Sequence, residues 1–153
     1  MDWIREPRLA VVSRPSPTDI ERELRELRIA GFATRVSLLS PAESVELELT
    51  GEPQAAVAAG LNFVSHPIPD FSVPGTGFVE RLFELHERYR SGESLAAHCR
   101  GGVGRSPLTI AGLLVLDGAD PDDAWSRVSA ARGVAVPDTA EQRQWIKTLS
   151  ARS

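Results

Sequence analysis

One segment of the sequence combines a nucleophile, a glycine-rich loop and an arginine at short spacing. Cys99 follows a short apolar run, and Arg105 lies six positions later, just before Ser106. Three of the five residues between Cys99 and Arg105 are glycines, which permit positive φ and let backbone N–H groups converge on one point. The apolar stretch that follows predicts a helix, whose N-terminus adds further N–H groups and partial positive charge. The pattern therefore predicts an anion-binding loop with a thiol at its base.

The chemistry that this arrangement favours is nucleophilic attack on a bound anion. Loop amides and a helix N-terminus around Cys99 favour the thiolate over the thiol, and the thiolate is the nucleophilic form of cysteine. A phosphate held in the loop would lie beside that sulfur. Attack of the thiolate on phosphorus would then give a cysteinyl-phosphate intermediate.

Other motifs with glycine or cysteine do not fit the spacing. A nucleotide-binding P-loop with its second glycine at Gly104 would need glycine at position 99 and lysine at position 105, where the chain has Cys99 and Arg105. A dinucleotide-binding fingerprint that starts at Gly102 would need its third glycine at position 107, which is Pro107. The cysteine and the three histidines show no paired ligand spacing, so we expect neither a metal nor another cofactor.

The rest of the chain alternates predicted strands with predicted helices. Short apolar runs bounded by turn residues predict strands at residues 9–12, 36–39, 63–66 and 94–98. Helical spacing of apolar residues predicts helices at residues 19–30, 41–49, 53–59, 78–90, 107–116, 121–131 and 137–149. This alternation predicts an α/β fold with a central, mostly parallel sheet of about four to five strands flanked by helices in three layers. We expect residues 1–153 to form one domain, because two separate cores of this size would each be marginal.

Two unusual loops follow predicted strands. The loop after His66 is rich in proline and carries Asp70, and the loop after His98 carries Cys99. Parallel α/β folds bind ligands at the carboxyl ends of their strands. We therefore expect both loops to lie on one rim of the sheet and to form the active site together.

Composition narrows the possible partners and location. The net charge of −4 gives no electrostatic footprint for nucleic acid. The longest uninterrupted apolar stretch, residues 110–116, is far shorter than the ~20 residues that a membrane helix needs, and the first residues contain no secretion signal. A single cysteine excludes an internal disulfide. We expect a cytoplasmic protein with no membrane insertion, and the sequence gives no signal of oligomeric state.

The segment from His98 to Ser106 resembles the signature of the cysteine-dependent protein tyrosine phosphatase superfamily. The short chain, with this motif in its second half, is most similar to the dual-specificity branch, which includes small atypical members and kinase-associated phosphatases. Residues 66–70 resemble the general-acid loop of that family. Residues 137–142 resemble its later segment, in which a glutamine orients water.

The resemblance implies a phosphatase-like fold and a metal-independent phosphoester hydrolase that acts on phosphorylated protein or peptide. Cys99 would be the nucleophile, Arg105 would bind the phosphoryl oxygens through its planar fork, and Asp70 would be the general acid. His98 would brace the loop, Ser106 would donate a hydrogen bond to the departing sulfur, and Gln142 would place the water. The implied phosphate-binding loop consists of Arg100, Gly101, Gly102, Val103, Gly104 and Arg105.

The resemblance leaves more than one substrate class open. Phosphotyrosine is the first expectation, with phosphoserine and phosphothreonine as further candidates. The basic residue after the cysteine, Arg100, also suits inositol phosphates or phosphoinositides, but the acidic overall charge and Val103 favour proteins. A phosphate-recognising pseudophosphatase is the remaining alternative, and the presence of Cys99, Arg105 and Asp70 argues against it.

Overall fold

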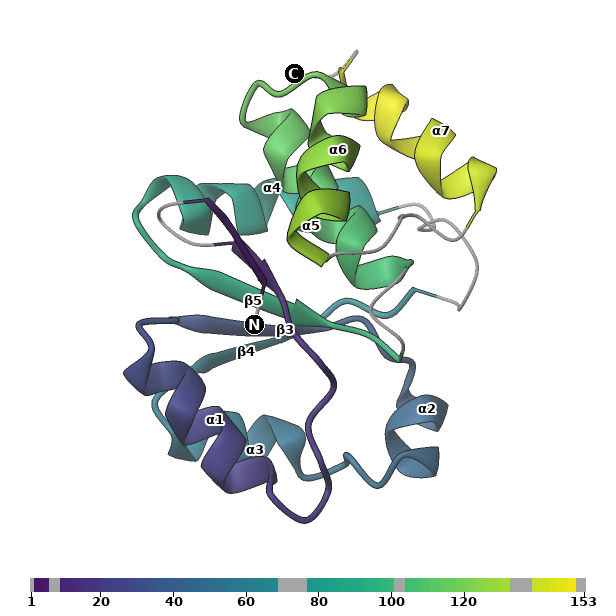
Figure 1. Ribbon diagram of the computed structural model, residues 1–153. Helices are drawn as coiled ribbons and strands as arrows, with labels where there is room; N and C mark the ends of the chain where they lie inside the picture. Colours follow the sequence, from purple (N-terminus) through teal and green to yellow (C-terminus); the bar gives the residue numbers. More distant parts are fainter. Residues whose placement is uncertain (1, 6–8, 69–76, 101–103, 133–138, 151–153) are drawn as a thin grey trace.

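The computed structural model describes residues 2–5, 9–68, 77–100, 104–132 and 139–150 (Figure 1). In chain order the elements are β1 (Asp2–Arg5), β2 (Leu9–Val11), α1 (Ile20–Ile29), β3 (Thr34–Ser37), α2 (Pro41–Glu46), α3 (Glu52–Ala58), β4 (Asn62–Ser65), α4 (Phe78–Arg90), β5 (Leu95–His98), α5 (Arg105–Leu116), α6 (Pro121–Arg132) and α7 (Ala140–Ser150). From β2 onwards the described part has strands separated by helices up to α5 and then ends with helices, as predicted from the sequence.

The strands form one sheet in the order β1-β2-β5-β3-β4. The pairs β2–β5, β5–β3 and β3–β4 are parallel, and β1 pairs antiparallel with β2 at one edge. The predicted mostly parallel sheet is therefore confirmed. Strand β1 was not predicted from the sequence, because Asp2–Arg5 is short and lacks a clear apolar pattern.

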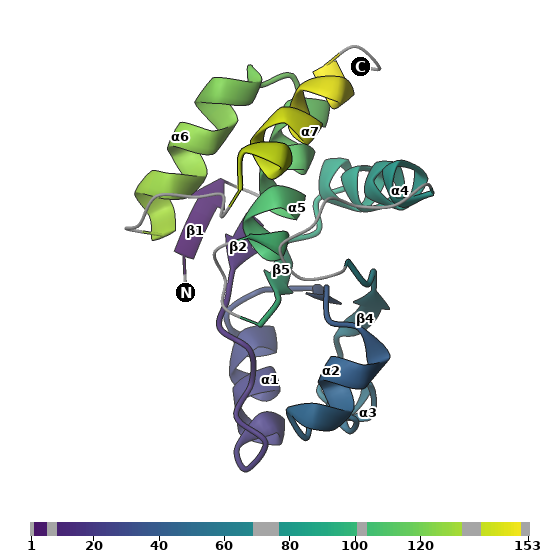
Figure 2. The same ribbon diagram turned by 90° about the vertical axis from the view of Figure 1, so that its right-hand side faces the viewer.

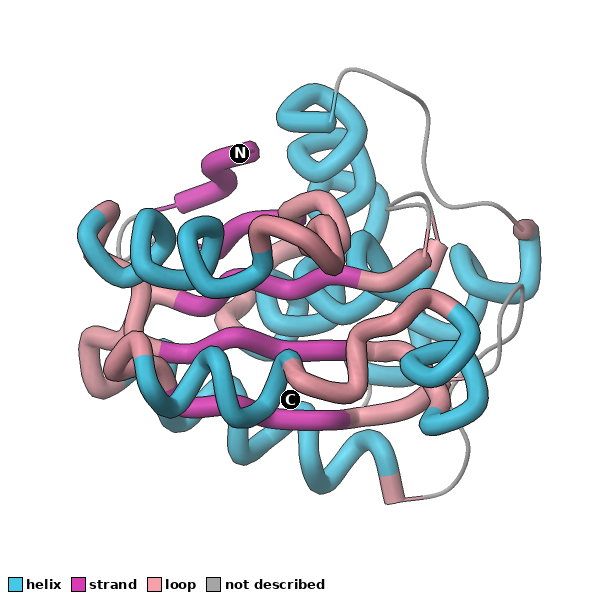
Figure 3. The backbone as a smooth tube through the Cα atoms, turned by 90° about the horizontal axis from the view of Figure 1, so that it is seen from below, coloured by secondary structure: helices cyan, strands magenta, loops and turns pink. Residues whose placement is uncertain are grey.

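Helices cover both faces of the sheet, which gives the predicted three layers (Figures 1 and 2). Helices α4 to α7 lie on one side, and α1 and α3 lie across the other, the face seen in Figure 3. Side chains from position 9 to position 12 alternate between the two faces of the sheet. Leu9 and Val11 of β2 belong to the larger core cluster under α4 to α7, whereas Ala10 and the next residue, Val12, belong to the smaller cluster under α1 and α3. The site-bearing strand β5 lies in the middle of the sheet.

Helix α5 is buried along its whole length. Every residue from Arg105 to Leu116 is buried, as expected of a helix that is apolar on all sides. It packs against α4, α6 and α7 as well as the sheet. A Cβ on Gly112 would lie 2.8 Å from Leu82 Cδ2 of α4 and 3.3 Å from Leu149 Cδ1 of α7. The close packing of these two leucines against α5 therefore depends on a glycine at position 112.

The observed bounds differ from the predicted ones by a few residues. Strand β3 begins at Thr34, two positions earlier than predicted. The apolar pattern missed this start because Arg35 is a charged residue, which is buried here in an ion pair with Glu52. Helix α5 begins at Arg105, two positions before Pro107. Helix α7 begins at Ala140, and positions 137–138 of the predicted helix lie outside the described residues. Within the described ranges, no helix has both the length and the apolar composition that crossing a membrane requires.

Candidate active site

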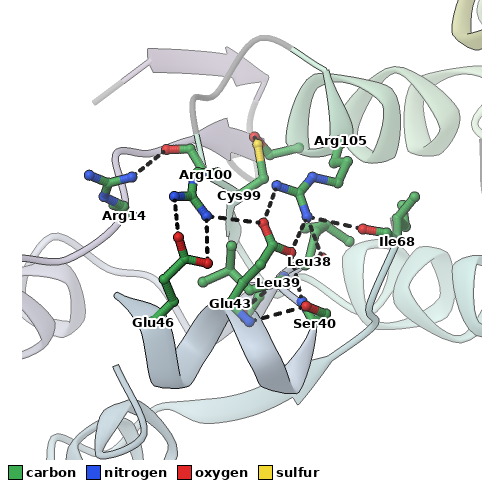
Figure 4. Close-up of polar contacts among 12 residues, drawn as sticks. Arg14, Leu38, Leu39, Ser40, Glu43, Glu46, Ile68, Cys99, Arg100 and Arg105 are labelled. Atoms are coloured by element: carbon green, nitrogen blue, oxygen red, sulfur yellow. Dashed lines mark hydrogen bonds and ion pairs between the residues drawn. The ribbon is translucent and has the colours of Figure 1, made fainter. Parts of the chain in front are cut away.

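The candidate site lies where three parallel strands end. Cys99 directly follows β5, Leu38 directly follows β3, and Ile68 lies three residues beyond β4. The Nη1 atom of Arg105 donates to the carbonyl oxygens of Ile68 and Leu38, at 3.0 and 3.5 Å (Figure 4). Arg105 thus contacts the backbone that follows β3 and β4, and the parallel strands end on one rim of the sheet.

The sulfur of Cys99 lies against the first turn of α5. Its Sγ is 3.2 Å from Oγ of Ser106, the second residue of the helix, and the Cys99 residue is only 3% exposed. A hydroxyl can rotate to donate to a thiolate. The cysteine is therefore placed at a helix N-terminus, as the sequence predicted, and the Ser106 hydroxyl lies within hydrogen-bond distance of its sulfur.

The guanidinium of Arg105 is fixed by Glu43 of α2. Nη1 donates to Oε1 at 2.7 Å and Nη2 to Oε2 at 3.0 Å, which is a two-point, charge-assisted contact (Figure 4). Burial raises the pKa of the Glu43 carboxyl, but hydrogen bonds from Arg105 and the Ser40 amide outweigh burial and hold the pKa at about 2. Glu43 is therefore ionised at neutral pH and holds the plane of the arginine fork.

Glu43 also shapes the start of its own helix. Its backbone N–H donates to Oγ of Ser40 at 3.2 Å, and its Oε1 accepts from the backbone N–H of Ser40 at 3.0 Å. This reciprocal pair is a capping box at the N-terminus of α2. One carboxylate thus fixes both a short helix and the buried arginine.

A buried charged network lies behind Cys99. Nε2 of His98 donates to Glu52, with its two carboxylate oxygens 2.7 and 3.0 Å away, and Nε of Arg35 donates to the same carboxylate at 3.0 Å. Burial raises the pKa of Glu52, but the hydrogen bonds and charges of His98 and Arg35 together outweigh burial and lower that pKa below its ordinary value. Burial lowers the pKa of His98. Since the ionised Glu52 can only accept, the proton of the neutral His98 ring is on Nε2.

His98 in turn lies against the backbone of the candidate nucleophile. Its Nδ1 is 3.4 Å from the carbonyl oxygen of Cys99. Because Nδ1 of this tautomer has no proton to donate to that carbonyl oxygen, the bracing of the loop by a hydrogen bond from His98 stays a prediction, and Glu52 of α3 holds the far side of the ring.

Arg100 lies at the surface beside this buried centre. Its Nη2 and Nη1 donate to Oε1 and Oε2 of Glu46 at 3.0 and 3.4 Å, and its carbonyl oxygen accepts from Nη1 of Arg14 at 3.3 Å (Figure 4). Side-chain exposure is 36% for Arg100, against 1% for Arg105. The two arginines of the motif therefore lie at different depths.

The buried Gln142 has a structural contact at the start of α7. Its Oε1 accepts from the backbone N–H of Thr139 at 3.2 Å, and its own N–H donates to Oγ1 of Thr139 at 3.1 Å. These bonds form a capping box. The side-chain oxygen of Gln142 therefore already caps a helix, and its role in placing water stays a prediction.

Some predicted site residues lie outside the described residues. These are Asp70 and the three loop residues Gly101, Gly102 and Val103. Gly104 is described and precedes the first turn of α5. Within the described ranges, no three His, Cys, Asp or Glu side chains form a group that could hold a metal ion.

Sequence reasoning missed the carboxylates that hold the site. The pattern Ser40-x-x-Glu43 was a usable signal for a capping box, although it does not point to Arg105. Glu52 and its partner His98 are 46 positions apart, so no local pattern connects them. Both carboxylates reach the site only through tertiary packing: α2 brings Glu43 to Arg105, and α3 brings Glu52 to His98.

Comparison with known proteins agrees with this geometry. A family model described as polymorphic toxin system, DSP-PTPase phosphatase matches residues 10–119. A curated relative, cyclin-dependent kinase inhibitor 3 of Rattus norvegicus, is 26% identical over 131 residues. That match covers 84% of this chain and 62% of the relative, so the chain spans less than two thirds of the relative's length.

Solved structures share the fold. A crystal structure of kinase associated phosphatase, with its catalytic-site cysteine replaced by serine, has a TM-score of 0.87 at 20% identity and covers 99% of this chain and 93% of that one. The active form of Tk-PTP has a TM-score of 0.78 at 29% identity, with coverage of 99% and 97%. These similarities confirm the predicted phosphatase-like three-layer fold. Because the family model spans most of the chain and includes the Cys99–Arg105 motif, the protein belongs to the DSP-PTPase family of phosphatases.

Proposed function

We propose that this protein hydrolyses phosphotyrosine in phosphorylated proteins or peptides, with phosphoserine and phosphothreonine as further candidate substrates. The observation that carries the proposal is the placement of Cys99 at the N-terminus of α5, 3.2 Å from the Ser106 hydroxyl, with Arg105 fixed on the same rim by Glu43. A thiol, a fixed cation and helix N–H groups in one place suit a phosphate ester better than a neutral substrate.

The first proposed step is transfer of the phosphoryl group to sulfur. The thiolate of Cys99 attacks phosphorus, the S–P bond forms, and the bond from phosphorus to the ester oxygen breaks. Asp70, protonated, gives its proton to that leaving oxygen. Arg105 and the loop amides of residues 100–105 stabilise the charge on the remaining phosphoryl oxygens, and Glu43 supports this because it fixes the guanidinium of Arg105.

The second proposed step regenerates the thiolate. Water, placed by Gln142, attacks phosphorus while the Asp70 carboxylate takes its proton, and the S–P bond breaks. Ser106 donates a hydrogen bond to the departing sulfur, in keeping with the 3.2 Å contact. The positive charge that this chemistry needs comes from Arg105 and backbone N–H groups, so we propose that the reaction is metal-independent.

The decisive experiment is hydrolysis of p-nitrophenyl phosphate and of phosphotyrosine, phosphoserine and inositol phosphate compounds in the presence of EDTA. Cys99→Ser should abolish phosphate release, and Arg105→Lys should lower kcat/KM at least about 100-fold, because lysine cannot form the two-point contact. Full activity of Cys99→Ser would remove the proposed mechanism. Release from inositol phosphates but not from phosphopeptides would replace the proposed substrate, and phosphopeptide binding without any turnover would indicate a pseudophosphatase.

The role of Asp70 has a separate test. Asp70→Asn should slow hydrolysis of alkyl or phenyl phosphates about 100-fold or more and that of p-nitrophenyl phosphate much less, because p-nitrophenolate leaves without a proton. Steady-state rates for a series of aryl phosphates of increasing leaving-group basicity measure this dependence. Equal slowing across the series would exclude Asp70 as the general acid.

A further inference from the structure

The side chain of Arg100 places a positive charge beside Cys99, outside the proposed phosphoryl-transfer machinery, to which Arg100 contributes only its backbone amide. It directly follows Cys99 but is 36% exposed, whereas the Cys99 residue is 3% exposed. Its guanidinium extends along the rim towards α2 (Figure 4). An exposed cation in this place is suited to contact the parts of a substrate that flank the reacting phosphate.

Glu46 is the carboxylate most closely engaged with Arg100. Both oxygens of Glu46 accept from Arg100, at 3.0 and 3.4 Å. Glu43 is 3.9 Å from the same guanidinium, but its oxygens are already engaged by Arg105 and by the amide of Ser40. A change at Glu46 therefore alters the charge balance of Arg100 while the contact between Glu43 and Arg105 stays in place.

A second exposed arginine comes to the same rim from the loop after β2. Nη1 of Arg14 donates to the carbonyl oxygen of Arg100 at 3.3 Å. The rim beside Cys99 thus carries the cations of Arg14 and Arg100, with Glu46 as the carboxylate that offsets Arg100. Loss of the Glu46 charge would leave this rim more positive by one unit.

We propose that Glu46 is a specificity-determining residue, which occupies Arg100 and thereby weakens the preference of the site for phosphopeptides with acidic residues beside the phosphorylated residue. The proposal rests on the proposed function. With the glutamate 62% exposed, the pair is a surface ion pair that contributes little to stability, so a substrate carboxylate can displace Glu46 from Arg100. An acidic peptide must therefore compete with Glu46 for Arg100, whereas a peptide with neutral flanks does not bind Arg100 in this way.

The experiment compares two phosphotyrosine peptides that differ only in their flanks, aspartate in one and asparagine in the other. The ratio of kcat/KM for the acidic peptide over the neutral peptide is measured for wild type, Glu46→Gln, Arg100→Gln and the double variant. Glu48→Gln is the matched control, because Glu48 is an exposed glutamate nearby that makes no ion pair with a described residue. The ratio should rise about twofold to fivefold in Glu46→Gln, as expected for one exposed charge pair, and the rise should shrink with added salt.

Three outcomes overturn the proposal: an unchanged ratio in Glu46→Gln, an equal rise in Glu48→Gln, or the same rise in the double variant as in Glu46→Gln alone. The first denies competition, the second indicates a general charge effect, and the third removes Arg100 from the effect. If no variant hydrolyses either peptide, the proposed function fails by itself. The ratio of the two dissociation constants, measured with Cys99→Ser and Cys99→Ser/Glu46→Gln, then tests Glu46 independently, and absence of binding contradicts both proposals.

Discussion

At the scale of single residues, the contact between Cys99 and Ser106 has the most direct chemical consequence. A hydroxyl 3.2 Å from the sulfur can stabilise negative charge there without an acidic proton of its own. In the proposed mechanism the sulfur carries that charge twice, as attacking nucleophile and as leaving group. The second step, in which the thiolate is the leaving group, depends more on Ser106. A hydrogen bond that stabilises the thiolate makes it a better leaving group but a weaker nucleophile.

We predict that Ser106→Ala lowers kcat about tenfold to 100-fold, since a hydrogen bond to a charged group contributes ~1.5–3 kcal/mol. Stopped-flow release of p-nitrophenol should show a fast burst followed by slow turnover, because the cysteinyl-phosphate accumulates. Ser126→Ala, at an exposed position of α6, should behave like wild type. A uniform fall in both phases would contradict the assignment of Ser106 to the second step.

At the scale of secondary-structure elements, α2 is the helix that brings Glu43 to Arg105. It has only six residues, and its capping box and its contact with Arg105 share the same carboxylate, Glu43. Helices this short are not stable alone, so α2 depends on these contacts. Protonation of Glu43 would weaken the helix start and the position of Arg105 together.

The pH dependence of stability should report on Glu43. Its pKa is about 2 in the folded protein, against an ordinary value of 4.5, so its contribution is fully present above about pH 4.5 and is lost as pH falls towards 2. Glu43→Gln removes that contribution at every pH. We predict that wild type is more stable than the variant near neutral pH and that the difference shrinks through this acidic window.

Urea unfolding of both proteins at about pH 7, 4 and 3 measures the difference in the free energy of unfolding. Glu52 is also ionised at neutral pH, with its pKa lowered, but it is present in both proteins and cancels in the comparison. A difference that stays constant from neutral to acidic pH would mean that the Glu43 charge does not contribute.

At the scale of the whole molecule, α5 joins the site to the fold. Its first residues hold Cys99 and the Glu43 contact, and its remaining residues pack against the sheet, α4, α6 and α7. A displacement of α5 in the core therefore moves Arg105 at the rim. We propose that residues 1–153 behave as one phosphatase domain with one cooperative unfolding transition, and two separate transitions in calorimetry would contradict this.

Gly112 tests the coupling between core and site. Alanine there gains helix propensity of ~1 kcal/mol, but its Cβ would lie 2.8 Å from Leu82 Cδ2, and Leu82 is fully buried. Overpacking of this kind costs ~1–3 kcal/mol, so we predict that Gly112→Ala lowers the free energy of unfolding by about 1 kcal/mol. Urea unfolding measures the loss, and greater stability of the variant would show that α4 and α7 can separate without cost.

The sequence by itself determined the chemistry-bearing segment and the type of fold. Apolar runs and turn residues located β2, β3, β4 and β5 to within a few positions, because strand and helix periodicities are local properties. The spacing of Cys99, Arg105 and Ser106 indicated an anion-binding loop, since strand, loop and helix N-terminus are contiguous in the chain. These predictions needed no knowledge of which segments meet in space.

Only the tertiary structure decided which groups hold that segment in place. The pairs Arg105–Glu43 and His98–Glu52 join residues 62 and 46 positions apart, and the same glutamates would read as solvent-facing charges in any local pattern. The buried Glu52 and the partly buried Glu43 are tolerated because each carboxylate meets cations or donors from other elements. The physical reason for the division is range: backbone periodicity acts over a few residues, whereas a buried charge is satisfied by partners that only the packing of the whole chain brings within about 3 Å.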